Sequence, residues 1–297
     1  MKILHVEGDT FAIDTGMLLI PFYKINKNDI ILLDSGWKRG EKEGILNLLD
    51  RENFNVKAII ISHSHIDHIG NASVIKKKYN SIIAMTSIEA EIVSSNISLK
   101  VFYGDYSLSK VTDHFGHMVT DTDIRISPSD NSLSLFGVTF DIIHTPGHSP
   151  GHIVIKTPDN VAYLGDALIS YEIMEGFKMP YAFILKHDIE SKLKLYHLNA
   201  KKYILAHKGI HIDIKDLITD NIYFYKNRAD MILEVIEGLM TFEDILKAAT
   251  KKLEIQIKTV EKYMVIKRML RSYIEYLIET NKIEVVMDHG FMKYTRL

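Results

Sequence analysis

The sequence predicts an α/β fold, and three observations support this prediction. Short apolar runs rich in β-branched residues alternate with amphipathic helical stretches over the first two thirds of the chain. Four of these runs lead directly into a histidine or an aspartate, a placement typical of sites at the carboxyl ends of strands in α/β folds. From about residue 214 onward the periodicity is helical, which predicts a smaller second unit.

Length and composition exclude several classes of protein. A chain of 297 residues with 46% hydrophobic residues is long enough for one large domain and one small domain with real cores. The formal net charge of -2 gives no general attraction for nucleic acid or anionic membranes. The absence of cysteine excludes disulfides and thiolate ligands.

Targeting and membrane segments are not expected. The first residues carry charge at Lys2 and Glu7, which argues against a signal peptide. The longest uncharged apolar runs, such as 17–23, are far shorter than the ~20 residues that a membrane helix needs. We therefore expect a cytoplasmic protein without a membrane partner.

The first part of the chain predicts a meander of four short strands. These strands are expected at 3–6, 10–13, 17–25 and 29–33, separated by turns that contain Gly, Asn and Lys. The last strand runs into Asp34-Ser35-Gly36. Two interpretations of Asp34 stay open: it orients a metal-binding histidine, or it caps a turn.

A helix expected at 41–49 is followed by the strand 56–61, which ends in a cluster of histidines and an aspartate. Alternate side chains of an extended segment share a face, so His63 and His65 can bind one ion. The turn after Ile66 directs Asp67 and His68 toward a second ion. Imidazoles with a carboxylate suit zinc, and iron or manganese are alternatives.

Three further strands lead into candidate ligands. The strand 138–143 precedes His148, the strand 161–164 precedes Asp166, and the strand 202–206 precedes His207. The competing interpretation is that all of these residues are solvated turn residues or a tag, but the cluster is internal and mixed. Four strand ends agree, which favours a metal site.

These residues resemble the motifs of the metallo-β-lactamase superfamily. The pattern His63-x-His65-x-Asp67-His68 is followed by His148 in Thr-Pro-Gly-His, Asp166 in Gly-Asp-Ala and His207 in Ala-His-Lys-Gly. The resemblance covers about the first two thirds of the chain. It implies two divalent metal ions. The first ion would be held by His63, His65 and His148, the second by Asp67, His68 and His207, and Asp166 would bridge both.

The resemblance also implies the architecture. Strands lie on either side of an internal helix pair, expected at 71–79 and 87–93, with Asn71 a candidate N-cap of the first. Two β-rich halves stacked face to face with helices outside would form an αββα four-layer sandwich. His144 and His152, which flank the Thr-Pro-Gly-His turn, are expected to be hydrogen-bonded scaffold residues.

Two irregular segments are expected beside the metals, at 94–127 and 169–181. In the resembled superfamily the region that corresponds to the first segment commonly covers the active site and shapes substrate choice. The substrate-pocket candidates are His114 and His117 in the first segment and Tyr171 and Tyr181 in the second. For the two histidines, ordinary loop residues are the competing interpretation.

The C-terminal part predicts helices at 230–240, 241–249 and 259–280, followed by a hairpin of strands at 282–287 and 291–295. This order is similar to the winged-helix domain that ends some superfamily members. We therefore expect a catalytic domain at 1–218 and a winged-helix-like domain at 219–297. Lys258, Lys262, Lys267, Arg268 and Arg271 suggest nucleic-acid binding, but nearby acids offset them, which favours a docking or lid module.

The function that follows is a dinuclear metal-dependent hydrolase that cleaves a carboxylic ester, lactone or thioester with a metal-bound hydroxide. Asp67 would orient the nucleophile and handle a proton. The alternatives are a phosphodiesterase or ribonuclease of the same superfamily, and a single-iron oxidoreductase. The expected partner is a small-molecule substrate rather than nucleic acid, and a homodimer stays open.

Overall fold

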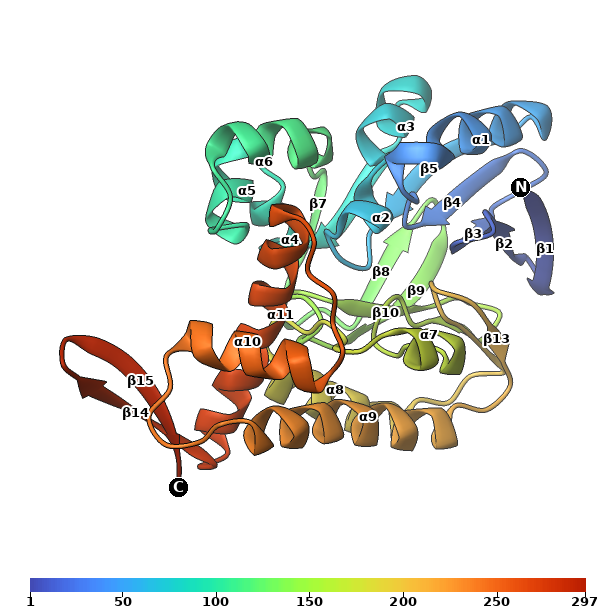
Figure 1. Cartoon of the computed structure of the whole chain (residues 1–297). Helices are drawn as coiled ribbons and strands as arrows, with labels where there is room; N and C mark the ends of the chain where they lie inside the picture. Colours follow the sequence, from blue (N-terminus) through green and yellow to red (C-terminus); the bar gives the residue numbers. More distant parts are fainter.

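The computed structural model describes residues 1–297 and contains two β-sheets packed face to face, with helices on both outer surfaces (Figure 1). The first sheet has seven strands in the order β1-β2-β3-β4-β5-β6-β7. Its strands are β1 (Lys2–Glu7), β2 (Thr10–Asp14), β3 (Leu19–Lys24), β4 (Asp29–Leu33), β5 (Asn55–Ile60), β6 (Ile82–Thr86) and β7 (Ile124–Ile126). Strands β1 to β4 pair antiparallel in sequence order, which confirms the expected meander. Strands β4 to β7 pair parallel.

The second sheet has six strands in the order β13-β12-β11-β10-β9-β8. Its strands are β8 (Ser132–Leu135), β9 (Val138–His144), β10 (Ile153–Lys156), β11 (Val161–Tyr163), β12 (Lys202–Ile204) and β13 (Ile210–His211). Strand β10 runs antiparallel to both β9 and β11, and β12 runs parallel to β11. Strands β9, β11 and β12 therefore point the same way, and their carboxyl ends meet at one edge.

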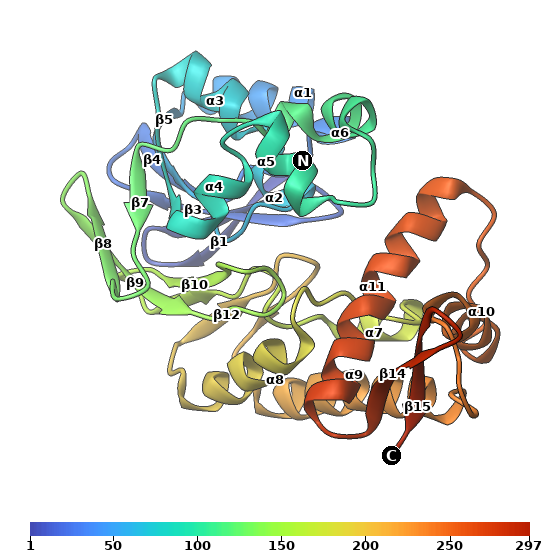
Figure 2. The same ribbon diagram turned by 90° about the vertical axis from the view of Figure 1, so that its left-hand side faces the viewer.

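The largest core lies between and around the two sheets. It joins residues of the first sheet, such as Ile31 and Ile59, to residues of the second, such as Phe140 and Ile155. Helices α1 (Lys38–Arg51) and α3 (Ala72–Tyr79) pack on the first sheet, and α8 (Leu185–Lys194) and α9 (Lys215–Glu234) lie outside the second (Figure 2). The expected α/β sandwich is confirmed, and both of its sheets are mixed.

The segment expected to be irregular, 94–127, is largely helical. After α4 (Ser87–Ile92) it contains α5 (Asn96–Phe102), α6 (Leu108–Phe115) and the 3₁₀ turn Gly116–Met118. Ser95 and Ser107 cap the two α-helices by accepting hydrogen bonds from backbone amides of the first turn. These helices are too short to produce a sustained period, so the prediction of an irregular segment was wrong.

The segment expected to be irregular at 169–181 contains one short helix, α7 (Tyr171–Gly176), which begins after its cap Ser170. Asn71 occupies the N-cap position of α3, but its side chain does not cap the helix. It donates instead to the backbone oxygen of Ser35, which fixes the turn after β4.

The C-terminal part contains α9, α10 (Phe242–Lys252), α11 (Val260–Glu279) and the hairpin β14 (Ile283–Asp288) and β15 (Phe291–Arg296). The helix expected at 230–240 was wrong: α9 covers its first half and ends at Glu234. The order of helices and hairpin is as expected, and the winged-helix likeness stays a prediction.

The proposed division at residues 218 and 219 falls inside α9, and the two domains stay a prediction. One core cluster joins Met179, Leu185 and Ile189 of the first part to Tyr225, Leu270 and Tyr273 of the tail. This shared core holds α11 against the expected catalytic domain, residues 1–218, which is the catalytic half of the molecule. No helix is long and apolar enough to cross a membrane.

Candidate metal centre

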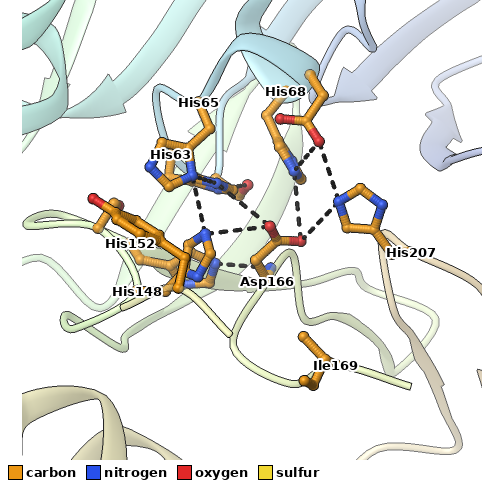
Figure 3. A network of polar contacts seen from close by, with 12 residues as sticks. His63, His65, His68, His148, His152, Asp166, Ile169 and His207 are labelled. Atoms are coloured by element: carbon orange, nitrogen blue, oxygen red, sulfur yellow. Dashed lines mark hydrogen bonds and ion pairs between the residues drawn. The ribbon is translucent and has the colours of Figure 1, made fainter. Parts of the chain in front are cut away.

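Four strand ends bring the seven predicted ligands together (Figure 3). The turn after β5 and the short helix α2 (Ile66–Ile69) carry four of them, and the turns after β9, β11 and β12 carry one each. They form two groups in which ligand atoms lie within 4.8 Å of one another. The first group is His63, His65, His148 and Asp166, and the second is Asp67, His68 and His207.

The first group is built around three imidazole rings. Nδ1 of His65 lies 2.9 Å from Nε2 of His63 and 3.0 Å from Nε2 of His148. Oδ2 of Asp166 lies 3.2 Å from the same His148 nitrogen and 3.9 Å from that of His63. Three ring nitrogens and one carboxylate oxygen therefore converge on one point.

The second group uses the other oxygen of Asp166. Oδ1 of this carboxylate lies 3.5 Å from Nε2 of His68 and 3.6 Å from Nε2 of His207. Oδ2 of Asp67 lies 3.1 Å from the His207 nitrogen and 3.8 Å from the His68 nitrogen. The two oxygens of one buried carboxylate thus face two separate sets of nitrogens.

The pKa shifts follow from burial and from the charges that face one another in the two groups. Burial, followed by neighbouring imidazoles, holds the pKa of His63 well below its usual value, so this ring is neutral. Burial opposes ionisation of Asp67, but His68 and His207 lower its pKa to about 2. Burial also lowers the pKa of His68, yet the carboxylates of Asp166, Asp67 and Asp34 raise it well above its usual value.

The residues fit a pair of divalent cations. Nε2 of His68 is buried and has no hydrogen-bond partner, although it faces two carboxylates. The donors are imidazole nitrogens and carboxylate oxygens, which suit zinc, iron or manganese. A positive ion in the first group would satisfy ring nitrogens that face one another at short range, and an ion in the second would satisfy Nε2 of His68.

Asp34 fixes the orientation of two rings. Its carboxylate accepts hydrogen bonds from Nδ1 of His68 at 2.7 Å, from the amide and hydroxyl of Ser62 at 2.6 Å each, and from Tyr163 at 2.6 Å. The Ser62 hydroxyl also lies 3.0 Å from Nδ1 of His63. Of the two interpretations of Asp34, the structure supports the one in which it orients a histidine.

Glu89 of α4 holds the two loops that carry His65 and His148. One carboxylate oxygen accepts hydrogen bonds from the amide and the hydroxyl of Ser64. The other accepts from the Ser149 hydroxyl at 2.6 Å and the Gly151 amide at 2.7 Å. The sequence did not single out Glu89, since a glutamate within a charged helical stretch resembles any surface residue.

The Thr-Pro-Gly-His turn is pressed against α8. Gly147 has φ of +137°, and a Cβ built there would lie 2.1 Å from the amide nitrogen of Asp188. The Ser191 hydroxyl donates to the backbone oxygen of Pro146 at 2.7 Å. Only glycine allows this approach, so α8 determines the position of His148.

His152 and His144 are scaffold residues, as expected. The buried ring of His152 accepts from the Asp166 amide at 3.1 Å, and its other nitrogen lies 2.8 Å from the Thr145 hydroxyl. Nε2 of His144 donates a hydrogen bond to the backbone oxygen of Asp130 at 2.8 Å. His152 therefore supports the backbone on which Asp166 stands.

The four candidate pocket residues lie in different parts of the structure. The ring of Tyr181 lies 5.3 Å from that of His65 and 5.6 Å from that of His148, between ring centroids. The Tyr171 hydroxyl instead donates to Asp220 on α9, at the surface. His114 and His117 line a different cavity, beside Ile66 and the start of α1. Tyr181 is thus the one of the four that contacts the histidine cluster.

Comparison with known proteins identifies the family. A model of the metallo-beta-lactamase superfamily matches residues 22–207, well over half of the chain. The chain belongs to the metallo-beta-lactamase superfamily. The match ends at the last candidate ligand, and the region from α9 onward lies outside it.

Two curated relatives of this superfamily member are hydroxyacylglutathione hydrolases. The GloC enzyme of Haemophilus influenzae is 30% identical over 147 residues, which cover 48% of this chain and 63% of that protein. Hydroxyacylglutathione hydrolase 1 of Vibrio vulnificus is 25% identical over 175 residues, 58% of each protein. The chain thus spans less than two thirds of either relative.

A beta-lactamase domain protein from Burkholderia ambifaria is similar in structure to this superfamily member. The TM-score is 0.72 with 15% identity, over all of this chain and 94% of that one. At this identity the likeness concerns the fold alone. It extends over the C-terminal part, which the family match leaves out.

Proposed function

We propose that this protein is a dinuclear metal-dependent hydrolase of an acyl substrate, with a thioester as the first choice and a carboxylic ester or lactone next. Superfamily membership and the names of the relatives indicate a metal-dependent hydrolase. The observation that carries the dinuclear proposal is Asp166, whose two carboxylate oxygens face separate nitrogen sets.

In this proposal His63, His65 and His148 would hold one ion, Asp67, His68 and His207 would hold the other, and Asp166 would supply one carboxylate oxygen to each. Two bound divalent ions would lower the pKa of a water and polarise the scissile carbonyl. The full second set argues against a site for a single iron. Zinc is the metal that this donor set favours.

Asp67 has the role of orienting the attacking water. Its pKa of about 2 keeps the carboxylate ionised, so it accepts a hydrogen bond from the water. Its side chain and that of His207 are each about a quarter exposed, whereas His63 and His68 are buried. Substrate would reach the centre from this exposed side.

Tyr181 is the proposed donor to the substrate carbonyl oxygen. Its hydroxyl is buried without a hydrogen-bond partner, and burial raises its pKa, so the phenol stays protonated. Hydrolysis then forms a bond between the acyl carbon and the water oxygen and breaks the bond to sulfur. The thiolate leaves and takes up a proton.

A thioester comes first because both curated relatives are named for hydrolysing one. The glutathione part of such a substrate stays outside the proposal. The family match stops before α9, so it gives no basis for assigning glutathione binding to the C-terminal part of this chain.

The C-terminal part is proposed to complete the substrate pocket rather than to bind nucleic acid. On α11, Lys267 and Arg271 lie 3.7 Å and 4.0 Å from Asp105 of the catalytic half. The Tyr273 hydroxyl donates to the backbone oxygen of Pro180 at 2.9 Å, next to Tyr181. Cations that face the catalytic half are poorly placed to bind phosphates.

A substrate panel tests the proposal. Protein reconstituted with zinc is incubated with thioesters, carboxylic esters, lactones, phosphodiesters and RNA, and hydrolysis is followed for each. We expect acyl hydrolysis that the variant His65→Ala loses and the matched variant His144→Ala keeps. Cleavage of phosphodiesters or RNA alone would replace the proposed substrate class.

A further inference from the structure

A groove of about 1050 Å³ lies between α11 and the catalytic half of the molecule. Its walls are largely aromatic and aliphatic, with Phe102, Tyr106 and Phe183 on one side and Met264 of α11 on the other. Gly147 and Tyr181 also line it, and these residues adjoin the histidine cluster. None of the seven candidate ligands lines the groove, but through Gly147 and Tyr181 one end of it lies next to the candidate metal centre.

Arg268 of α11 lies in this groove within an aromatic cage. Its guanidinium carbon is 4.4 Å from the ring centroid of Phe102, 4.7 Å from that of Tyr103 and 5.1 Å from that of Tyr181. Aromatic faces attract a cation, but they do not accept the in-plane N–H bonds of the fork. Nη2 of Arg268 is buried and has no hydrogen-bond partner.

Arg268 differs from the neighbouring cations of α11. Lys267 and Arg271 lie within 4.0 Å of the Asp105 carboxylate, whereas Arg268 makes no ion pair. Burial raises the pKa of the Tyr103 and Tyr181 phenols, and the nearby Arg268 guanidinium opposes this rise, so its neutral polar neighbours are these two hydroxyls. A partly buried guanidinium that faces aromatic rings and neutral phenols has no anionic acceptor, and a bound carboxylate would supply one.

The charges around the groove select the kind of acceptor. Glu91, Asp105 and Glu275 line the groove with Arg268 and Arg271, so acids offset the cations. A dianion such as a phosphate ester, or the repeated charges of RNA, would meet repulsion from these carboxylates. A single carboxylate on an otherwise apolar molecule matches one guanidinium fork and hydrophobic walls.

We propose that Arg268 binds a carboxylate carried by the acyl substrate, while the apolar part of that substrate fills the groove and the Tyr181 hydroxyl stays available to the scissile carbonyl. The proposal rests on the proposed acyl hydrolase function and narrows its substrate to acidic acyl compounds. Arg268 is a binding residue that sets specificity, and the C-terminal part supplies it to the pocket.

Binding provides the first test. Isothermal titration calorimetry on the zinc-loaded full chain compares 4-phenylbutyrate with 4-phenylbutyramide, which differ in charge and hardly in shape. We expect the carboxylate to bind about tenfold more tightly. Arg268→Met should abolish this preference, and Arg271→Met, which alters an arginine already paired with Asp105, should keep it. A preference that persists in Arg268→Met overturns the proposal.

Kinetics provides the second test, with the S-phenyl monothioesters of adipic acid and adipamic acid. For Arg268→Met we expect kcat/KM to fall about tenfold or more on the acid and to change less than about twofold on the amide. Equal kcat/KM values on both substrates, unchanged in the variant, reject the carboxylate site and leave acyl hydrolysis standing. If neither thioester is hydrolysed, the proposed thioesterase function is contradicted. The binding measurement then still shows whether Arg268 binds a carboxylate.

Arg268→Lys keeps the proposal testable if the methionine variant does not fold. Lysine keeps the charge among the aromatic rings but lacks the two-pronged fork. We expect carboxylate binding several-fold weaker than in the parent, with the melting temperature nearly unchanged. Unaltered carboxylate affinity in this variant contradicts the proposal.

Discussion

Two buried carboxylates that are not candidate ligands hold the ligands in place. Asp34 and Glu89 each accept four hydrogen bonds, and each ties together segments that are far apart in the sequence. Asp34 connects β4 to His68 and to Tyr163 of the second sheet. Glu89 connects α4 to the loops around Ser64 and Ser149. The precision of the site therefore depends on residues outside it.

Glu89→Gln should destabilise the protein and weaken metal binding. The amide nitrogen cannot accept, so at least one of the buried donors from Ser149 and Gly151 or from Ser64 loses its partner. We expect a loss of about 1–3 kcal/mol in the free energy of unfolding, measured by urea denaturation. Glu91→Gln, which removes an exposed pair with Arg125, should cost less than about 1 kcal/mol. Equal effects of the two changes would contradict the role of Glu89.

Asp67→Asn should reduce turnover much more than stability. The amide keeps the shape but weakens the proposed metal ligand and its hold on the attacking water. We expect kcat to fall by about 100-fold or more on any substrate that the parent hydrolyses, while the metal-free variant melts at a temperature close to that of the metal-free parent. The surface change Asp141→Asn, which removes a pair with Lys156, serves as the control. Full turnover in Asp67→Asn would remove Asp67 from the mechanism.

At this scale the sequence predicted the residues that lie in motifs and offered Asp34 and His152 as supporting residues, but it missed Glu89 and the role of Arg268. The seven candidate ligands stand at strand ends in a recognisable spacing, and the structure brings all seven together. Glu89 and Arg268 carry no such signal, because only the folded chain shows that Glu89 is buried and that Arg268 lacks an acid partner. Tyr171 and Tyr181 looked equivalent, since sequence spacing does not show which phenol faces the cluster.

At the scale of elements, the turn that carries His148 packs closely against α8, with no room for a side chain at Gly147. Gly147→Ala should displace this turn, since the new methyl group would meet the backbone of Asp188. We expect loss of metal from the first group, measured by elemental analysis. We also expect the free energy of unfolding to fall by more than about 2 kcal/mol, measured by thermal melting.

Gly137→Ala is the matched control for this change. Gly137 also has a positive φ, of +80°, but a Cβ there would meet nothing within 4 Å. The alanine therefore carries the backbone strain without the steric clash. We expect it to cost about 1 kcal/mol and to leave metal content unchanged. If both variants behaved alike, strain rather than contact with α8 would explain the effect.

Elements with strong local signals were predicted well. The meander and the long helix after Thr259 agree with the structure, because alternation and the cap fix them locally. The helices α5 and α6 were missed, since they are short and gain their stability from packing of residues such as Leu99 and Val111. The end of α9 at Glu234 was missed because the apolar pattern continues past it.

Over the whole molecule, the candidate centre joins the two sheets. The turn after β5 belongs to the first sheet, and the turns with His148, Asp166 and His207 belong to the second. Bound metal should therefore stabilise the sandwich as a cross-link. Zinc at about 100 times its Kd should add about 2.7 kcal/mol per site, seen as a rise in melting temperature that a chelator reverses.

Two variants sharpen this measurement. His207→Ala should remove about half of the stabilisation by zinc, because it affects the second set alone. His211→Ala, which changes a nearby histidine that is not a candidate ligand, should leave the effect intact. A melting temperature that does not respond to zinc in the parent would contradict a cross-linking site.

Removal of residues 239–297 should expose the core that the tail shares with the catalytic half. Met179, Leu185 and Ile189 pack against Leu270 and Tyr273, so the shortened chain would present an apolar surface to water. We expect the shortened chain to associate or precipitate. Size-exclusion chromatography measures the association, and binding of a hydrophobic dye measures the exposed apolar surface. A soluble, monodisperse fragment with unchanged kinetics would instead show that the tail is an independent unit.

The spread of the seven residues along the chain also bears on how the protein matures during synthesis. The first is His63 and the last is His207, so a ribosome has translated most of the sandwich before the set is complete. A nascent chain that ends before β9 holds only part of each group. Stable metal uptake should thus follow the docking of the second sheet rather than guide the folding of the first, and cells short of metal would accumulate a folded precursor awaiting its ions.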